Sequence, residues 1–134
     1  MKTKFSKTWI SSIQPRKQRK YVHNATLDIK STFLSVNLSK DLRKKHGARN
    51  VRIRTGDKVK IMRGTFKSKT GIVEKVDLKH SKVYVAKIEA TKRDGSKAKV
   101  PLTPSNLQII ELNLIDKKRK AKLTPKENKK LEDN

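Results

Sequence analysis

An excess of positive charge constrains this chain more than any other feature of its sequence. Its 134 residues include 36 Lys and Arg against 12 Asp and Glu, so the formal net charge is +24. Repulsion among so many like charges opposes a compact state unless a polyanion neutralises it. A nucleic acid is therefore the expected partner. No apolar stretch approaches the roughly 18 residues that a membrane span needs, and no apolar signal-peptide region follows Met1. We expect a cytoplasmic protein with no membrane partner.

Apolar side chains are scarce. Hydrophobic residues make up only 33% of the sequence, which is sufficient for one small core. Six aromatic residues are scattered along the chain: Phe5, Trp9, Tyr21, Phe33, Phe66 and Tyr84. We therefore expect phosphate contacts to outweigh stacking on bases. The absence of cysteine from the sequence excludes disulfides, thiolate metal sites and thiol nucleophiles.

Charge and patterning divide the chain into a basic N-terminal extension (1–50), a central domain (51–112) and a basic C-terminal extension (113–134). The basic run at 15–20 lacks apolar periodicity, so we expect an extended, RNA-contacting arm, with a solvated disordered tail as the alternative. A short helix is predicted near 39–46, with Ser39 as its N-cap and Gly47 at its end. Residues 26–37 fit either a short amphipathic turn or an extended strap.

The central domain has the alternation of short strands. Strands are predicted at 59–61, 71–76, 82–88 and 107–110, and a two-residue hairpin turn at Asp94-Gly95 is predicted to join strands at 88–91 and 98–100. Short strands joined by tight turns predict a mainly β fold, a small antiparallel barrel that leaves no exposed sheet edges. Beyond it, a basic run occupies 117–120. Thr124 to Glu127 resembles a capping box, which predicts a last helix from Pro125 to about Leu131.

One loop carries the most informative pattern. Gly64 and Gly71 bracket a basic segment, and a glycine permits a positive φ or a close backbone approach. Phe66 is the only apolar residue between them, available to stack on a base or ribose. The alternative is an ordinary hairpin with a solvated loop.

The surrounding sequence resembles a known family. The pattern Gly56-Asp57-x-Val59-x-Ile61-x-x-Gly64, followed by Lys67-x-Lys69-x-Gly71-x-Val73, is similar to the KOW motif of ribosomal proteins and transcription elongation factors. The flanking segments are 14–20, Asn24-Ala25, 38–43, Asp94-Gly95 and 104–107. They resemble the archaeal and eukaryotic type of the universal large-subunit ribosomal protein twenty-four family over residues 14 to about 122. One departure is Ser68, where the family most often has glycine.

The resemblance implies an SH3-like barrel that binds the 5′ domain of the large-subunit ribosomal RNA, near the mouth of the polypeptide exit tunnel, with an early part in subunit assembly. Neighbouring ribosomal proteins are the other implied partners. The side chains expected to contact RNA are Arg16, Lys17, Arg19, Lys20, Arg43, Lys44, Arg63, Phe66, Lys67, Lys69, Lys117, Lys118, Arg119 and Lys120, while Gly64, Gly71, Asp94 and Gly95 are expected to form structural turns.

Three other classes of function fit the sequence less well. An enzyme is disfavoured because His23, His46 and His80 are far apart and lie in no catalytic or metal-binding motif. We expect no cofactor, metal or small-molecule substrate. A transcription elongation factor would need a further folded domain, and residues 1–50 have too few apolar residues to form one. A DNA-packaging protein is compatible with the charge alone.

Overall fold

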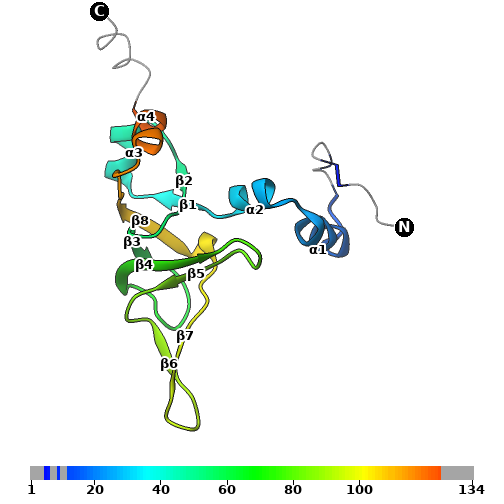
Figure 1. The fold of residues 1–134 in the computed structure, drawn as a ribbon, viewed down its shortest axis with the longest axis vertical. Helices are drawn as coiled ribbons and strands as arrows, with labels where there is room; N and C mark the ends of the chain where they lie inside the picture. The colour runs from blue at the N-terminus through cyan, green and yellow to red at the C-terminus, as the bar shows by residue number, and fades with distance from the viewer. Residues whose placement is uncertain (1–4, 7–8, 10–11, 125–134) are drawn as a thin grey trace, which may run out of the picture.

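A computed structural model of the chain describes residues 5–6, 9 and 12–124. These residues form two sheets and four α-helices (Figure 1). The larger sheet has the strand order β2-β1-β8-β3-β4-β5, and the smaller is the hairpin β6-β7. The strands are β1 (Ser35–Leu38), β2 (Asn50–Arg52), β3 (Lys58–Ile61), β4 (Thr70–Asp77), β5 (Lys82–Val85), β6 (Glu89–Thr91), β7 (Lys97–Lys99) and β8 (Leu107–Glu111). The helices are α1 (Pro15–Asn24), α2 (Leu27–Phe33), α3 (Lys40–His46), α4 (Lys117–Leu123) and the 3-10 turn η1 (Pro104–Asn106).

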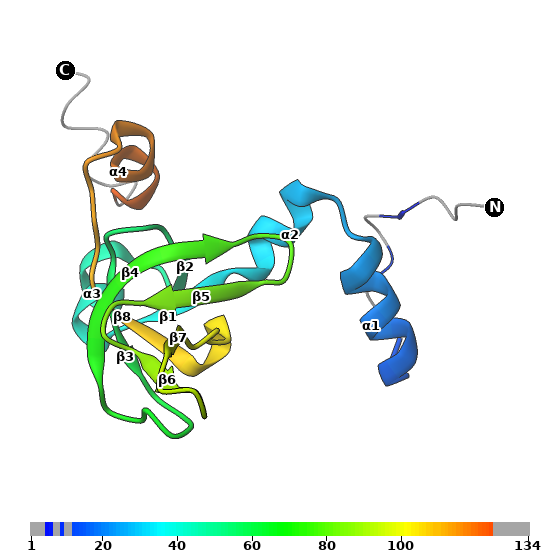
Figure 2. The same cartoon turned by 60° about the horizontal axis from the view of Figure 1, so that its bottom comes forward.

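Three groups of helices and strands extend outward from the larger sheet. The helices α1 and α2 extend to one side of it in Figure 1 and again in Figure 2. In Figure 1 the β6-β7 hairpin projects from the bottom of the molecule, and α3 and α4 lie together at the top. The basic segments of the sequence therefore lie at different places around one scaffold.

The prediction of a mainly β protein is confirmed, but the all-antiparallel arrangement is wrong. Strand β1 pairs parallel to β8, with Leu38 opposite Ile109, and the other ladders are antiparallel. The parallel pair forms because the chain preceding position 51 supplies a strand that inserts between β2 and β8. The sheet is also open: within the described residues, no ladder joins its terminal strands β2 and β5.

A single cluster of aliphatic side chains forms the core of the described residues. Inward-facing residues alternate along β1, β3, β5 and β8. The buried set is Leu34, Val36, Leu38, Ile53, Val59, Ile61, Val73, Val83, Val85, Ile88, Leu107 and Ile109. Each such side chain contributes about 1.5–3 kcal/mol by leaving water. The expected single small core therefore combines β1, which precedes the predicted central domain, with β3, β5 and β8 inside that domain.

The cap-based helix prediction is confirmed. The Ser39 hydroxyl accepts a hydrogen bond from the Leu42 amide at the start of α3, and Gly47 ends the helix with φ 61°. For residues 26–37, the sequence left open a short amphipathic turn or an extended strap. Neither describes the whole segment, because it contains helix α2 and then strand β1.

The extended arm predicted at 15–20 is instead the first part of helix α1. Pro15 occupies the start of this helix, where its missing N–H costs nothing. Arg, Lys and Gln are good helix formers, so propensity favours a helix that apolar periodicity does not reveal. Pairing of Tyr21 with Phe33 then links α1 to α2.

The turn at Asp94-Gly95 joins β6 and β7 as predicted. Its loop, counted between the hydrogen-bonded residues Lys92 and Ser96, has three residues rather than two. The Gly95 amide donates to the Lys92 carbonyl, and the Lys92 amide donates to the Ser96 carbonyl. Only Gly95 has a positive φ in this loop, 82°, whereas a two-residue type I′ turn needs two such residues. The strand predicted from Lys82 also ends early, at Val85, before the positive φ of Lys87. The helix predicted from Pro125 lies outside the described residues.

Candidate nucleic-acid interface

Three exposed basic groups follow from this fold. The α1 group consists of Arg16, Lys17, Arg19 and Lys20, all solvent-exposed on one short helix. The loop group, Arg63, Lys67 and Lys69, projects from the connection between β3 and β4. The α4 group is Lys117, Lys118 and Lys120. Exposed side chains of this kind can meet phosphates without breaking internal contacts.

The loop group has a defined backbone. The Ile61 amide donates to the Lys69 carbonyl, and the Ser68 amide donates to the Ile61 carbonyl, which closes the loop at its base. Gly64 has φ 94° and Ser68 has φ 70°, so this serine adopts the left-handed conformation that favours glycine. Gly71 has a different role. A Cβ atom there would lie 2.6 Å from Val85 Cγ1 and 2.9 Å from the Ala86 carbonyl oxygen, so this glycine permits close packing of β4 on β5.

Phe66 is only partly available for stacking. Its half-buried ring packs against the hydrophobic core, and the Lys69 ammonium lies 5.2 Å from the ring centroid. The contact is a cation–π interaction that orients the lysine beside the loop. In α3, Lys44 is exposed, whereas Arg43 is half-buried.

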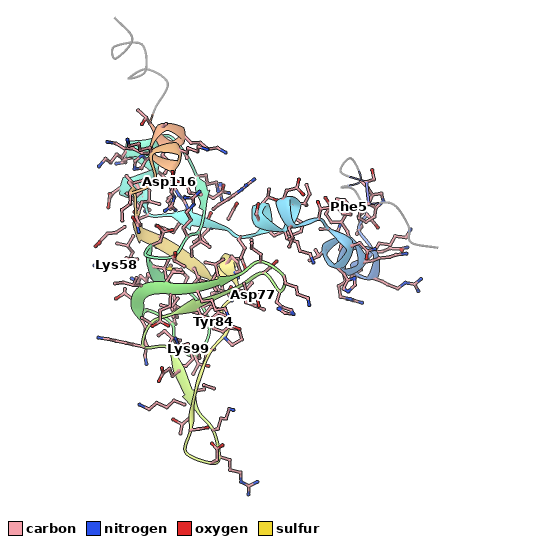
Figure 3. The ribbon with its side chains drawn as sticks, viewed as in Figure 1. Phe5, Lys58, Asp77, Tyr84, Lys99 and Asp116 are labelled. Atoms are coloured by element: carbon pink, nitrogen blue, oxygen red, sulfur yellow. The ribbon has the colours of Figure 1, made fainter. Side chains whose placement is uncertain are left out.

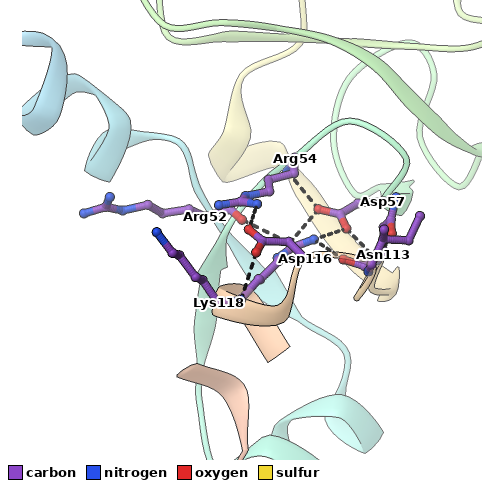
Figure 4. A network of polar contacts seen from close by, with 8 residues as sticks. Arg52, Arg54, Asp57, Asn113, Asp116 and Lys118 are labelled. Atoms are coloured by element: carbon purple, nitrogen blue, oxygen red, sulfur yellow. Dashed lines mark hydrogen bonds and ion pairs between the residues drawn. The ribbon is translucent and has the colours of Figure 1, made fainter. Parts of the chain in front are cut away.

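Arg119 differs from its basic neighbours. Only 6% of this residue is exposed, and it forms a buried ion pair with Asp57, which is 0% exposed. Its Nη1 donates to Asp57 Oδ1 at 2.7 Å and its Nη2 donates to Asp57 Oδ2 at 2.8 Å, a two-pronged contact. Figure 4 shows the network of polar contacts around Asp57. The guanidinium also donates to the carbonyls of Arg52 and Asn113. We therefore remove Arg119 from the RNA-contacting set and assign it a structural role.

The Asp57–Arg119 pair fixes the position of α4. Asp57 lies in the turn before β3 and also accepts hydrogen bonds from the backbone amides of Arg54 and Asn113. Leu123, four residues after Arg119, is the other buried residue of α4, and its carbonyl lies 3.1 Å from His46 Nδ1 of α3. Residues four apart share one face of a helix, so this face docks while the lysines of the α4 group face solvent.

Asp116 caps the same helix. Its carboxylate accepts a hydrogen bond from the Lys118 amide and forms an ion pair with Arg54. The Arg54 guanidinium, together with the Lys118 amide, holds the pKa of the Asp116 carboxyl below its usual range. In Figure 4 the side chains of Arg52 and Lys118 extend away from Asp57. Both line a cavity of about 420 Å³ between β2 and α4, together with Arg54 and Lys122.

Sequence reasoning missed two features of this surface. The Asp57–Arg119 pair joins residues 62 positions apart, and its only signal was a lone acid in a basic motif. The second is the meeting of Phe5, Trp9, Tyr21 and Phe33, which were expected to be scattered. Within the described part of the chain, no group of His, Asp and Glu could hold a metal ion, and no helix there is long and apolar enough to cross a bilayer.

The chain is similar to known proteins of the large ribosomal subunit. The ribosomal L26 family, which comprises eukaryotic L26 and its archaeal L24 counterparts, matches residues 12–126. A relative from Methanocorpusculum labreanum, large ribosomal subunit protein uL24, is 45% identical over 87% of this chain and 97% of its own length. The uL24 proteins of Methanoculleus marisnigri and Nanoarchaeum equitans are 45% and 43% identical, over 85% and 89% of this chain and 94% and 80% of their own lengths.

The class of the protein is thus a structural constituent of the ribosome rather than an enzyme. More specifically, the chain belongs to the ribosomal L26 family of eukaryotic L26 and archaeal L24 proteins. The resemblance predicted from the sequence is confirmed, as is the expected location in the cytoplasmic ribosome, where large-subunit proteins of this family reside.

Proposed function

We propose that this ribosomal constituent binds the large-subunit ribosomal RNA through the α1, loop and α4 groups at once. The observation that carries the proposal is the selective exposure of cations on α4. Its one arginine is buried as a structural anchor, while Lys117, Lys118 and Lys120 remain exposed. Because Arg119 keeps the helix docked, its exposed lysines can contact a partner while the helix stays bound to the sheet.

The charge of α4 is itself unfavourable in the free protein. Lys117 and Lys118 lie in the first turn, where the helix dipole disfavours cations, and the seven-residue helix contains no acidic residue. Asp116 offsets part of this cost by capping the helix. A polyanion at this end would relieve the remaining repulsion, and each phosphate neutralised would release condensed counterions.

The α1 group supports the same proposal. Helix α1 contains no acidic residue, and its two arginines and two lysines are all exposed to solvent. Arginine presents a planar fork that matches phosphate, so Arg16 and Arg19 suit contacts that depend on RNA shape.

The finer parts of the proposal derive from the family resemblance. They are binding to the 5′ domain of the RNA, support of early subunit assembly, a position near the polypeptide exit tunnel and contact with neighbouring ribosomal proteins. An SH3-like arrangement of the KOW type in the open sheet, as the platform between the basic groups, belongs to the same proposal.

Affinity for a 5′-domain RNA fragment, measured over a range of salt concentrations, tests the proposal. We expect the triple variant Lys117→Gln, Lys118→Gln, Lys120→Gln to bind more weakly, with a salt slope lower by about 0.7–0.9 for each phosphate that is no longer neutralised. The matched control neutralises three other exposed lysines, Lys75, Lys79 and Lys92. Equal decreases in affinity for the two triple variants would mean that total charge, not the α4 group, determines binding.

A second variant separates shape recognition from charge. Arg16→Lys combined with Arg19→Lys preserves the formal charge but removes both forks. We expect this double variant to lose more affinity for the ribosomal fragment than for a length-matched duplex, with an unchanged salt slope, because a good charge-assisted contact contributes about 1–3 kcal/mol. Parental affinity on both RNAs would contradict this role for the α1 group.

A further inference from the structure

Four aromatic side chains of the N-terminal region form a cluster that phosphate binding does not explain. The Tyr21 ring lies 5.0 Å from the Phe5 ring, 5.3 Å from the Trp9 ring and 6.2 Å from the Phe33 ring, measured between centroids. All three pairs are tilted, at separations typical of favourable aromatic contacts. Each of the four residues is half-buried rather than enclosed in the core. In Figure 3 Phe5 lies beside α1, away from the sheets.

An open pocket of about 300 Å³ adjoins this cluster. The rings of Phe5, Trp9 and Tyr21 line it, and α1 contributes Lys17, Lys20 and Asn24. Lys17, Lys20, Tyr21 and Asn24 are spaced three, four and seven positions apart, so they share one face of the helix. The volume is at the lower end of the range for pockets that bind small organic groups. Aromatic faces and ammonium groups therefore converge on one space.

We propose that this pocket binds one unpaired nucleobase of ribosomal RNA. The base stacks on an accessible aromatic face, and the phosphates on either side of it meet Lys17 and Lys20. The proposal rests on the RNA-binding function above and adds a base-contacting site to a surface otherwise suited to phosphates. It places base stacking in the N-terminal region rather than at Phe66, whose ring packs on the core.

Charge complementarity favours RNA over a protein segment as the occupant. Residues 1–27 contain seven Lys and Arg and no Asp or Glu, so the surroundings attract a polyanion. An apolar peptide side chain could fill the space between the rings but would gain nothing from two lysines at its edge. A nucleotide uses both features, since every base has a π-face and every nucleotide carries a phosphate.

Trp9 provides a direct probe because it is the single tryptophan of the sequence. We expect a short single-stranded oligoadenylate to quench Trp9 fluorescence in the full-length protein, because a stacked base deactivates the indole. An RNA duplex of the same length should bind through its phosphates and leave the emission nearly unchanged. Quenching by both RNAs alike, or by neither, would overturn the proposal.

A pair of variants measures the contribution of the pocket. Trp9→Leu keeps an apolar side chain but removes a stacking surface, so we expect binding to oligoadenylate to weaken about 5-fold or more. Phe33→Leu is the matched control, since Phe33 belongs to the cluster but does not line the pocket. Equal affinities of both variants and the parent would overturn the proposal.

The same measurements distinguish this proposal from the function on which it rests. If the parent binds the 5′-domain fragment with no change in Trp9 emission and no sensitivity to Trp9→Leu, RNA binding holds and the base pocket is wrong. If the parent binds no RNA, both proposals fail. If Trp9 emission responds when the protein joins complete large subunits but to no RNA alone, isolated RNA does not occupy the pocket and the proposal is likewise overturned.

Discussion

Replacing Arg119 with Met tests whether the buried ion pair determines the stability of this fold. Methionine approximates the length of the arginine stem but removes the guanidinium, which makes two hydrogen bonds to the Asp57 carboxylate and one each to two carbonyls. Asp57 would then remain buried with only the backbone amides of Arg54 and Asn113 as partners. Removing one partner of a buried pair costs about 3–5 kcal/mol.

A loss of that size is a large part of the stability of a small domain, which is about 5–15 kcal/mol in total. At about 4 °C per kcal/mol for a domain of this size, Tm should fall by about 12–20 °C. Thermal unfolding followed by circular dichroism measures this change. Arg119→Lys should give an intermediate loss, because the ammonium retains the charge but not the fork.

Lys118→Met is the matched control for Arg119→Met. It removes the same charge from the neighbouring, solvent-exposed position of α4, so we expect a change within about 0.5 kcal/mol. If Arg119→Met unfolded at the same temperature as this control, the buried pair would contribute no net stability. A structural role for Arg119 would then be contradicted, and an RNA contact by this residue would again be possible.

Other predictions concern the loop between β3 and β4. Ser68→Gly should raise the unfolding free energy by about 0.5–1 kcal/mol, since glycine relieves the positive φ of 70° but adds entropy to the unfolded chain; an unchanged or lower Tm would contradict this. Gly71→Ala should lower Tm, because its Cβ atom would meet Val85 Cγ1 at 2.6 Å. Lys67→Glu with Lys69→Glu should leave Tm within about 2 °C of the parent, in line with exposed sites, while weakening RNA binding. Equal losses of Tm for the lysine and glycine variants would make the loop structural rather than RNA-binding.

Local signals predicted the elements whose formation depends on nearby residues. The alternation of Val59 and Ile61, and of Val83 and Val85, predicts strands that bury one face, and the structure has both. Ser39 and Gly47 delimit a helix because caps act within one turn of the chain.

Features that depend on distant residues could not be predicted in this way. Strand β1 pairs parallel to β8 across about seventy residues, and no short pattern specifies that partner. In the sequence Arg119 is one cation in a run of four, no local pattern marks it for burial, and only the fold brings it to Asp57. Helix α1 escaped prediction for another reason: its helical propensity is intrinsic to its residues, and apolar periodicity does not detect it.

Cross-linking within intact large subunits tests the central claim most directly. A photo-activatable amino acid would replace Lys20, Lys67 or Lys118, one from each basic group, with exposed Lys75 as the control position. The account predicts that the three test positions cross-link to ribosomal RNA, within its 5′ domain, and that Lys75 does so much less. Cross-links confined to proteins, or equal RNA cross-linking from all four positions, would contradict it.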